Sequence, residues 1–290
     1  MIISVSRRTD IPACYSEWFF NHLKAGHAMV KNPFNPKQIK KADLSPQAVD
    51  AFVFWTKDPK PMLTRLDELS DYTYYFTFTL TPYGIDIEPG FNDKSYLIQT
   101  FKDLSLMIGQ EKVIWRYDPI LLNDKYTKEF HIEKFKGIAA ELKGFTEKCV
   151  ISFVDSYRSI SKALASIGSK EIKVQDMKEM AEPMSKAALN SNMILATCCE
   201  PLDLSTYGIT NNKCIDDDLI SRISGKEIKA GKDHNQREAC GCAASIDIGA
   251  YDTCPKGCLY CYANHSRKTL KRNLMKHNPN SPFLDGLESI

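Results

Sequence analysis

The sequence predicts an α/β protein whose parallel strands form a (β/α) barrel or partial barrel of about six to seven strands. Strand-like and helix-like segments alternate along roughly the first two hundred residues. The strand-like segments are apolar on both faces, as in a buried parallel sheet. Polar residues follow the C-terminal end of each of these segments, and in such folds the active site lies at that end of the strands.

The expected strands are short runs rich in β-branched and aromatic residues. A seventh run at 245–251 follows the main set and leads into a cysteine motif. The main set comprises 2–6, 51–56, 72–80, 113–118, 149–156 and 193–199.

The expected helices carry apolar residues at three- and four-residue spacings. Because they separate the strands, we expect right-handed crossovers between parallel strands. They span 95–110, 129–145, 174–191 (despite Pro183), 216–224 and 266–277.

Polar side chains at the ends of the expected strands predict a pocket at one mouth of the barrel. For any single residue, a solvated loop is the alternative interpretation. Two neighbouring guanidinium groups, on Arg7 and Arg8, favour an anionic substrate group, and we expect them to act in catalysis together with Asp10. The other polar residues of this set are Lys57, Arg116, Asp118 and Ser152.

Composition is that of an ordinary globular chain. Its 290 residues are 43% hydrophobic, and the net charge of +2 favours no particular partner. No apolar run approaches the ~20 residues of a membrane span, and the N-terminus does not resemble a signal peptide. We therefore expect a cytoplasmic protein without membrane contact, in which the ten cysteines stay reduced.

The cysteines are unevenly distributed, which suggests metal binding. Cys14 and Cys149 are isolated and are expected to lie in the core, whereas the other eight fall between 198 and 261. We divide the chain into a main barrel body (1–199), a cysteine-containing insertion (200–244) and a segment that completes the barrel (245–290).

The stretch CPKGCLYC places Cys254, Cys258 and Cys261 at the spacing C-x3-C-x2-C. A structural zinc site needs four ligands, which His265 would complete. A [4Fe–4S] cluster held by three thiolates would instead keep one iron free for an exogenous ligand.

This stretch resembles the CxxxCxxC motif of radical S-adenosylmethionine enzymes, including the aromatic residue before the last cysteine. The wider context TCPKGCLYCYANHS, with RYDPI and WTK at other strand ends, is similar to the spore photoproduct lyase branch. The resemblance implies a [4Fe–4S] cluster on the three cysteines. It also implies S-adenosylmethionine on the free iron, cleaved by an electron from a donor such as a flavodoxin or ferredoxin. The product would be a 5′-deoxyadenosyl radical that abstracts hydrogen from an unknown substrate.

The same resemblance implies a cofactor pocket. Tyr260 would pack on the adenine. We expect Lys57 to pair with the cofactor carboxylate, and Ser152, Arg116 and Asp118 to hold the ribose and amino-acid ends. A structural ion pair is the alternative for Arg116 and Asp118.

In that superfamily the motif follows the first strand, whereas here it follows the last. A circular permutation explains the difference, because neighbouring strands stay neighbours wherever the chain begins. It predicts that the strand at 245–251 lies beside the strand at 2–6. The whole chain also resembles an uncharacterised family that begins SRRTDIPA and ends with the triad.

Further cysteines predict a second metal site, either a [4Fe–4S] cluster or zinc. The expected ligands are Cys199, Cys214, Cys240 and Cys242. Alternate strand residues point to opposite faces, so only one of Cys198 and Cys199 should join, and Cys199 lies nearer the loop. Packed, reduced thiols are the alternative.

Two other functions fit parts of the sequence. One is a zinc-stabilised nucleic-acid-binding module that uses the basic segment 266–276, although the whole chain is nearly neutral. The other is an electron-transfer protein with two clusters. The sequence leaves the substrate and the oligomeric state open.

Overall fold

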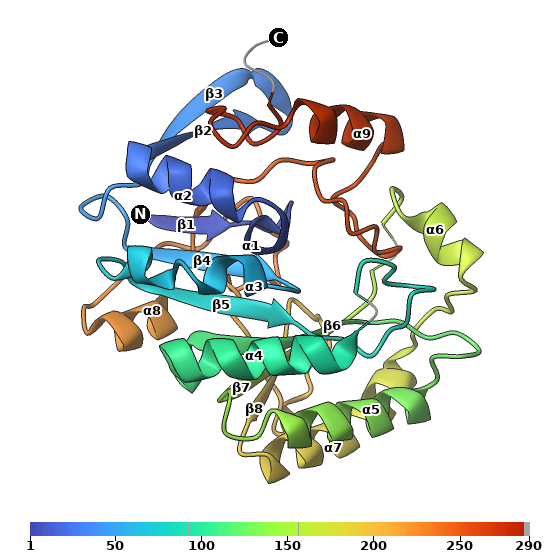
Figure 1. The fold of residues 1–290 in the computed structure, drawn as a ribbon. Helices are drawn as coiled ribbons and strands as arrows, with labels where there is room; N and C mark the ends of the chain where they lie inside the picture. Colours follow the sequence, from blue (N-terminus) through green and yellow to red (C-terminus); the bar gives the residue numbers. More distant parts are fainter. Residues whose placement is uncertain (92, 156, 287–290) are drawn as a thin grey trace.

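The computed structural model describes residues 1–91, 93–155 and 157–286. Its centre is an open sheet with the strand order β10–β1–β4–β5–β6–β7–β8–β9, in which all neighbours run parallel (Figure 1). This confirms the α/β fold as a partial rather than a closed barrel. The strands are β1 (Ile2–Val5), β4 (Ala51–Thr56), β5 (Tyr74–Thr79), β6 (Val113–Ile120), β7 (Lys148–Phe153), β8 (Ile194–Thr197), β9 (Thr210–Asn211) and β10 (Ile246–Asp247).

The helices alternate with the strands, and side chains cap several of their N-termini. Asp93 accepts a hydrogen bond from the Tyr96 amide at the start of α4, and Thr127 caps α5 in the same way. The α-helices are α1 (Ile11–Cys14), α2 (Ser16–Ala25), α3 (Lys60–Leu63), α4 (Lys94–Ile108), α5 (Lys128–Glu141), α6 (Ser161–Ser166), α7 (Val174–Asn190), α8 (Asp217–Ser224) and α9 (Arg267–Lys276). Single 3₁₀ turns occur at Leu66–Leu69, Gln110–Lys112 and Ser205–Tyr207.

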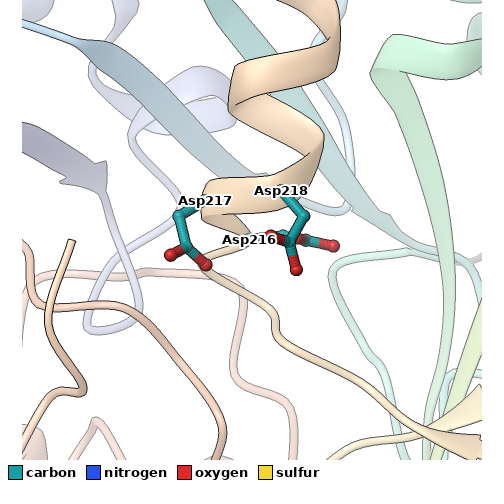
Figure 2. Close-up of side chains that lie close together, drawn as sticks. All are labelled: Asp216, Asp217 and Asp218. Carbon is teal, nitrogen blue, oxygen red and sulfur yellow. The ribbon is translucent and has the colours of Figure 1, made fainter. Parts of the chain in front are cut away.

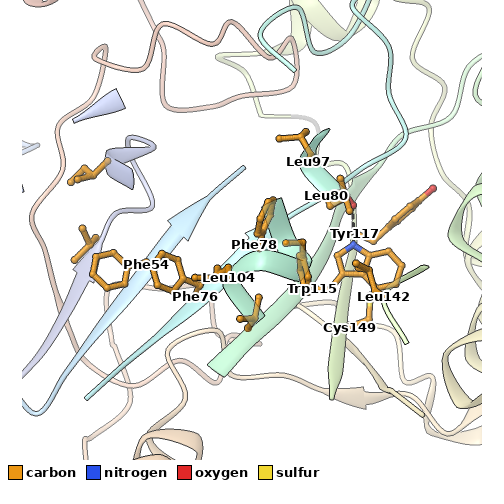
Figure 3. Close-up of a cluster of buried hydrophobic side chains, with 14 of the residues drawn as sticks. Phe54, Phe76, Phe78, Leu80, Leu97, Leu104, Trp115, Tyr117, Leu142 and Cys149 are labelled. Carbon is orange, nitrogen blue, oxygen red and sulfur yellow. Dashed lines mark hydrogen bonds between the residues drawn. The ribbon is translucent and has the colours of Figure 1, made fainter. Parts of the chain in front are cut away.

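One face of the sheet packs on the helices through aromatic side chains (Figure 3). Phe54 and Phe76 stack with their ring centroids 4.6 Å apart, and Trp115 stacks on Phe135 of α5 at 4.9 Å. These rings are fully buried, so this layer is the main hydrophobic core.

The other face of the sheet is covered by the chain around α8. Val53, Tyr75 and Ile114 alternate with the aromatic residues and point to this side, where Leu219 and Ile220 of α8 pack on them. Residues 200–244 therefore fill the inner side of the partial barrel and also contribute β9 to its edge.

The first and last strands lie side by side, as the permutation predicts. Ile3 pairs with Ile246, and Ser4 pairs with Asp247. The Asp247 carboxylate accepts hydrogen bonds from Ser4 Oγ at 2.9 Å and from Ser6 Oγ at 2.6 Å. The SRRTD stretch, through Ser6, thus joins two parts of the chain that are 241 residues apart.

The sequence analysis did not predict the elements between the first two core strands. These are α1, α2 and an antiparallel hairpin of β2 (His27–Asn32) and β3 (Asn35–Asp43). Nearly all of β3 is exposed, so it has no apolar alternation to reveal it. Ser156, the last residue of one expected strand, and residues 287–290 lie outside the described residues.

Within the described ranges, every helix is too short or too polar to cross a lipid bilayer.

Candidate metal centres

The triad cysteines lie on the loop between β10 and α9, and each is half-buried. The Asp252 carboxylate accepts from the backbone amides of His265 and Ser266 at 2.6 and 2.8 Å and so closes this loop. Asn264 Nδ2 donates to the Cys254 carbonyl at 2.8 Å. The backbone around the three thiols is therefore fixed by the protein itself.

A buried carboxylate, Glu88, anchors the triad loop from the side. Its oxygens lie 2.8 Å from Lys57 Nζ and 2.6 Å from Lys94 Nζ, and Tyr260 Oη donates to it. Burial alone would raise the pKa of Glu88, but the two lysines hold it at about 2. The sequence analysis missed Glu88, because no motif marks it and its partners are distant in sequence.

Lys57 and Tyr260 are brought together, as expected for residues of one pocket. Lys57 Nζ lies 5.7 Å from the centre of the Tyr260 ring. However, the ammonium group already pairs with Glu88. Burial raises the pKa of Cys258, and the positive charge of Lys57 opposes that rise.

Asp10 has a structural position beside the triad. Its carboxylate accepts from the Ala13 amide at 3.0 Å and from the Lys57 amide at 2.8 Å, so it caps α1 and holds the end of β4. Burial raises the pKa of Asp10 to about 6.

Cys14, expected to be a core residue, packs against the main core and also contacts the triad. It is half-buried at the end of α1, and its thiol makes a hydrogen bond with Cys254 that lowers the pKa of Cys254. Tyr15 Oη donates to the Thr253 carbonyl at 2.5 Å and holds α1 against this loop. The two cysteines are far apart in sequence, so no spacing pattern could reveal the contact. Cys149 is buried in β7, as expected of a core residue.

Arg7 points from the end of β1 to the inner side of the sheet. Its Nη2 donates to Ser245 Oγ at 3.1 Å and lies 3.6 Å from Asp233 Oδ2. The guanidinium group faces the Trp55 ring at 5.7 Å. Cys242 is among the groups whose negative charge raises the pKa of Arg7, although burial opposes that rise.

Arg8 points along the junction of β1 and β10. Its Nε lies 3.9 Å from Asp247 Oδ1, and its Nη1 donates to the Gly249 carbonyl at 3.4 Å. It also faces the Tyr251 ring at 5.4 Å. Both arginines therefore already have carboxylate partners within the chain.

Arg116, Asp118 and Ser152 are brought together, but not beside Tyr260. Arg116 forms an ion pair with Asp118, which accepts a hydrogen bond from Ser152 Oγ. Arg116 Nη1 also donates to Cys214 Sγ at 2.8 Å. Arg116 and Asp118 are alternate residues of β6 on its inner face, and this directs them to the second set of cysteines.

That second set, here called the inner cysteine group, consists of Cys198, Cys199, Cys214, Cys240 and Cys242. The sulfurs of Cys198 and Cys214 lie 3.1 Å apart. Cys199, which we expected to be the ligand from β8, contacts Cys240, another expected ligand. Hydrogen bonds from Cys198 and Cys242, with the charge of Arg116, hold the pKa of Cys214 well below its usual range.

Three carboxylates at the start of α8 lie within 4.8 Å of one another (Figure 2). Asp216 caps the helix and lies 3.2 Å from Lys148 Nζ. Asp217 and Asp218 each lie 2.9 Å from Lys213 Nζ. Lysines and helix amides therefore satisfy this acidic group.

Comparison with known proteins gives one family and no individual relative. The family described as "Domain of unknown function (DUF1848)" matches residues 2–263, a range that includes the triad and the inner cysteine group. No curated protein and no solved structure matches the chain. The chain belongs to the DUF1848 family.

Proposed function

We propose that this protein is a radical S-adenosylmethionine enzyme. The observation that carries the proposal is the triad Cys254, Cys258 and Cys261, half-buried on a loop that follows an edge strand of a parallel sheet. Loops at the carboxyl ends of such strands are where α/β proteins bind ligands.

The donor set fits a [4Fe–4S] cluster with one iron left for an outside ligand. Three thiolates bind three irons, and partial exposure leaves room for a small molecule at the fourth. When both are bound, the cluster and S-adenosylmethionine supply a 5′-deoxyadenosyl radical that abstracts hydrogen. A flavodoxin or ferredoxin would supply the electron.

The surrounding residues hold the triad and balance its charge. Glu88 fixes Tyr260 and Lys57, so the aromatic ring before Cys261 has one position beside the site. Lys57 places a positive charge near Cys258 and Cys261, and this charge opposes the rise in the pKa of both thiols that burial causes.

A zinc site is less well supported at the triad. His265, the fourth ligand that zinc would need, is exposed and stacks on Tyr251 with the ring centroids 5.0 Å apart. Its backbone amide is held by Asp252.

For the substrate, we propose only a chemical class. Arg7 and Arg8 lie at the end of β1 near the triad, and we propose that they act on an anionic substrate group. Asp10, which we expected to act with them, holds the start of α1 and the end of β4 instead. Ten free cysteines fit a reducing compartment, so we propose a cytoplasmic enzyme.

Anaerobic reconstitution with iron and sulfide tests the proposal. After addition of dithionite and S-adenosylmethionine, we expect 5′-deoxyadenosine. Cys258→Ala should remove about four irons and reduce 5′-deoxyadenosine formation by roughly 100-fold or more. Cys149→Ala is the matched control, because Cys149 lies in the core away from both cysteine sets.

One result would contradict the proposal and favour the alternative function. It is stoichiometric zinc without broad visible absorption, together with nucleic-acid binding that weakens steeply with salt. The basic face of α9, which exposes Arg267, Lys268, Lys271 and Arg272, would carry that binding.

A further inference from the structure

The inner cysteine group draws five cysteines from three separate segments to one buried place. Cys198 and Cys199 follow β8, Cys214 precedes α8, and Cys240 and Cys242 precede β10. Cys214, Cys240 and Cys242 are 4%, 7% and 3% exposed. All are free thiols, so no disulfide explains their proximity.

Three N–H groups point at sulfur atoms of this group. Arg116 Nη1 donates to Cys214 Sγ at 2.8 Å, and Asn212 Nδ2 donates to the same sulfur at 3.4 Å. The Ile215 amide donates to Cys242 Sγ at 3.4 Å. Packed thiols need no such donors, whereas thiolates that bind a metal are held by hydrogen bonds of this kind.

The strand register distinguishes Cys198 from Cys199. Ala196 pairs with Val150, whose side chain lies on the inner face of the sheet. Cys198 is two residues further and shares that face, and its sulfur contacts Cys214. Cys199 has a φ of 56° and contacts Cys240, which lies at the opposite end of the row of sulfurs from Cys198.

We propose that Cys198, Cys214, Cys240 and Cys242 bind a [4Fe–4S] cluster through four protein thiolates, with Arg116 as a hydrogen-bond donor to Cys214. This inference stands whether or not the triad binds S-adenosylmethionine, because it uses none of the triad residues. It revises the expected ligand from Cys199 to Cys198.

The spread of the sulfurs favours a cluster over a single zinc ion. A tetrahedral zinc site, with Zn–S distances of ~2.3 Å, holds every pair of sulfurs about 3.8 Å apart. Among the described residues, no three cysteine sulfurs lie within 4.8 Å of one another. The group instead forms a row of contacts from Cys198 through Cys214 and Cys242 to Cys240. A cluster binds each thiolate at a different iron, so its sulfurs stand farther apart than those of zinc. The sulfur pairs beyond 4.8 Å fit a cluster better than zinc, and the 3.1 Å contact between Cys198 and Cys214 must open when either metal binds.

The first experiment removes the triad and leaves the fold-forming residues untouched. The variant Cys254→Ala/Cys258→Ala/Cys261→Ala changes only the half-exposed loop cysteines. After anaerobic reconstitution, we expect about four irons per chain and broad absorption in the visible range. Absence of iron, or zinc in its place, in this folded variant would overturn the inference. A loss of activity in the same variant would concern the triad alone.

The second experiment identifies the ligand from β8. In the triad-free background, Cys198→Ala should lose the remaining iron and Cys199→Ala should keep it. The two substitutions are chemically identical and adjacent, so each controls for the other, and circular dichroism checks that both variants fold. Equal retention of iron, or loss only with Cys199→Ala, would refute the assignment of Cys198.

Discussion

The triad and the inner cysteine group differ in exposure and in the charges around them. The triad lies on a loop, is half-buried, and has Lys57, Glu88 and Asp10 among its charged neighbours. The inner group is mostly buried and receives the guanidinium of Arg116. Three half-exposed thiols suit a metal site that also binds a small molecule. A buried group of thiols suits a metal site whose ligands all come from the protein. One parallel sheet thus carries a half-exposed set and a mostly buried set of cysteines.

The largest expected effect is at the anchor of the triad. Glu88→Gln removes the charge that pairs with both Lys57 and Lys94, and breaking such buried pairs costs about 3–5 kcal/mol of unfolding free energy. Urea denaturation measures the loss. Glu182→Gln, in an exposed pair with Lys186, should leave stability unchanged. If Glu88→Gln is equally neutral, Glu88 does not anchor the loop. Iron at the inner group should survive this change.

The corresponding change on the inner side is Arg116→Met. It leaves the Asp118 carboxylate without its ion-pair partner and should cost about 3 kcal/mol of unfolding free energy. Iron should be lost from the inner group but not from the triad, as measured in variants that keep only one set. Arg222→Met, which breaks an exposed pair with Glu147, is the control. Unchanged iron at the inner group would show that Arg116 has no part in binding it.

A pH titration separates loss of the whole fold from loss of either site. His131 is buried between Tyr117 Oη and the Leu121 carbonyl, at 2.8 Å from each. Burial lowers the pKa of His131 from 6.5 to about 4, so the unfolded chain binds the proton first as pH falls. Stability is complete above pH ~6.5 and should be lower by about 2 kcal/mol at pH 5. His131→Gln should remove this component in metal-free protein. A pH dependence that is unchanged in the variant would assign it to other groups.

The smallest expected effect is kinetic. In air, iron at the half-exposed triad should be lost roughly tenfold faster than iron at the inner group, because a buried site excludes solvent and oxidant. Absorbance should decay in two phases in the reconstituted protein. The fast phase should be missing from the triad-free variant. A single phase in the unchanged protein would contradict the proposed difference in the access of oxidant to the two sites.

The sequence predicted the parallel sheet well because its strands are apolar runs of the right length, and β10 lies beside β1 as the permutation requires. It did not predict Glu88 or the position of Cys14, since both meet the triad only through the fold. The preference for Cys199 over Cys198 rested on closeness to the loop. The register of β8 places Cys198 on the inner face as well, and register is a property of paired strands.

β10, the partner of β1 on one side, is among the last parts of the chain to be synthesised. The hydrogen bond from Ser4 to Asp247 can form only after Asp247 has been synthesised, 243 residues later. At ~5–20 residues per second, this delay is about 12–50 s. Until then the edge of β1 has no partner on that side, and the loop that carries the three cysteines does not yet exist. A chain that ends just before residue 254 therefore carries the segments of β1 to β10 but none of the three triad cysteines.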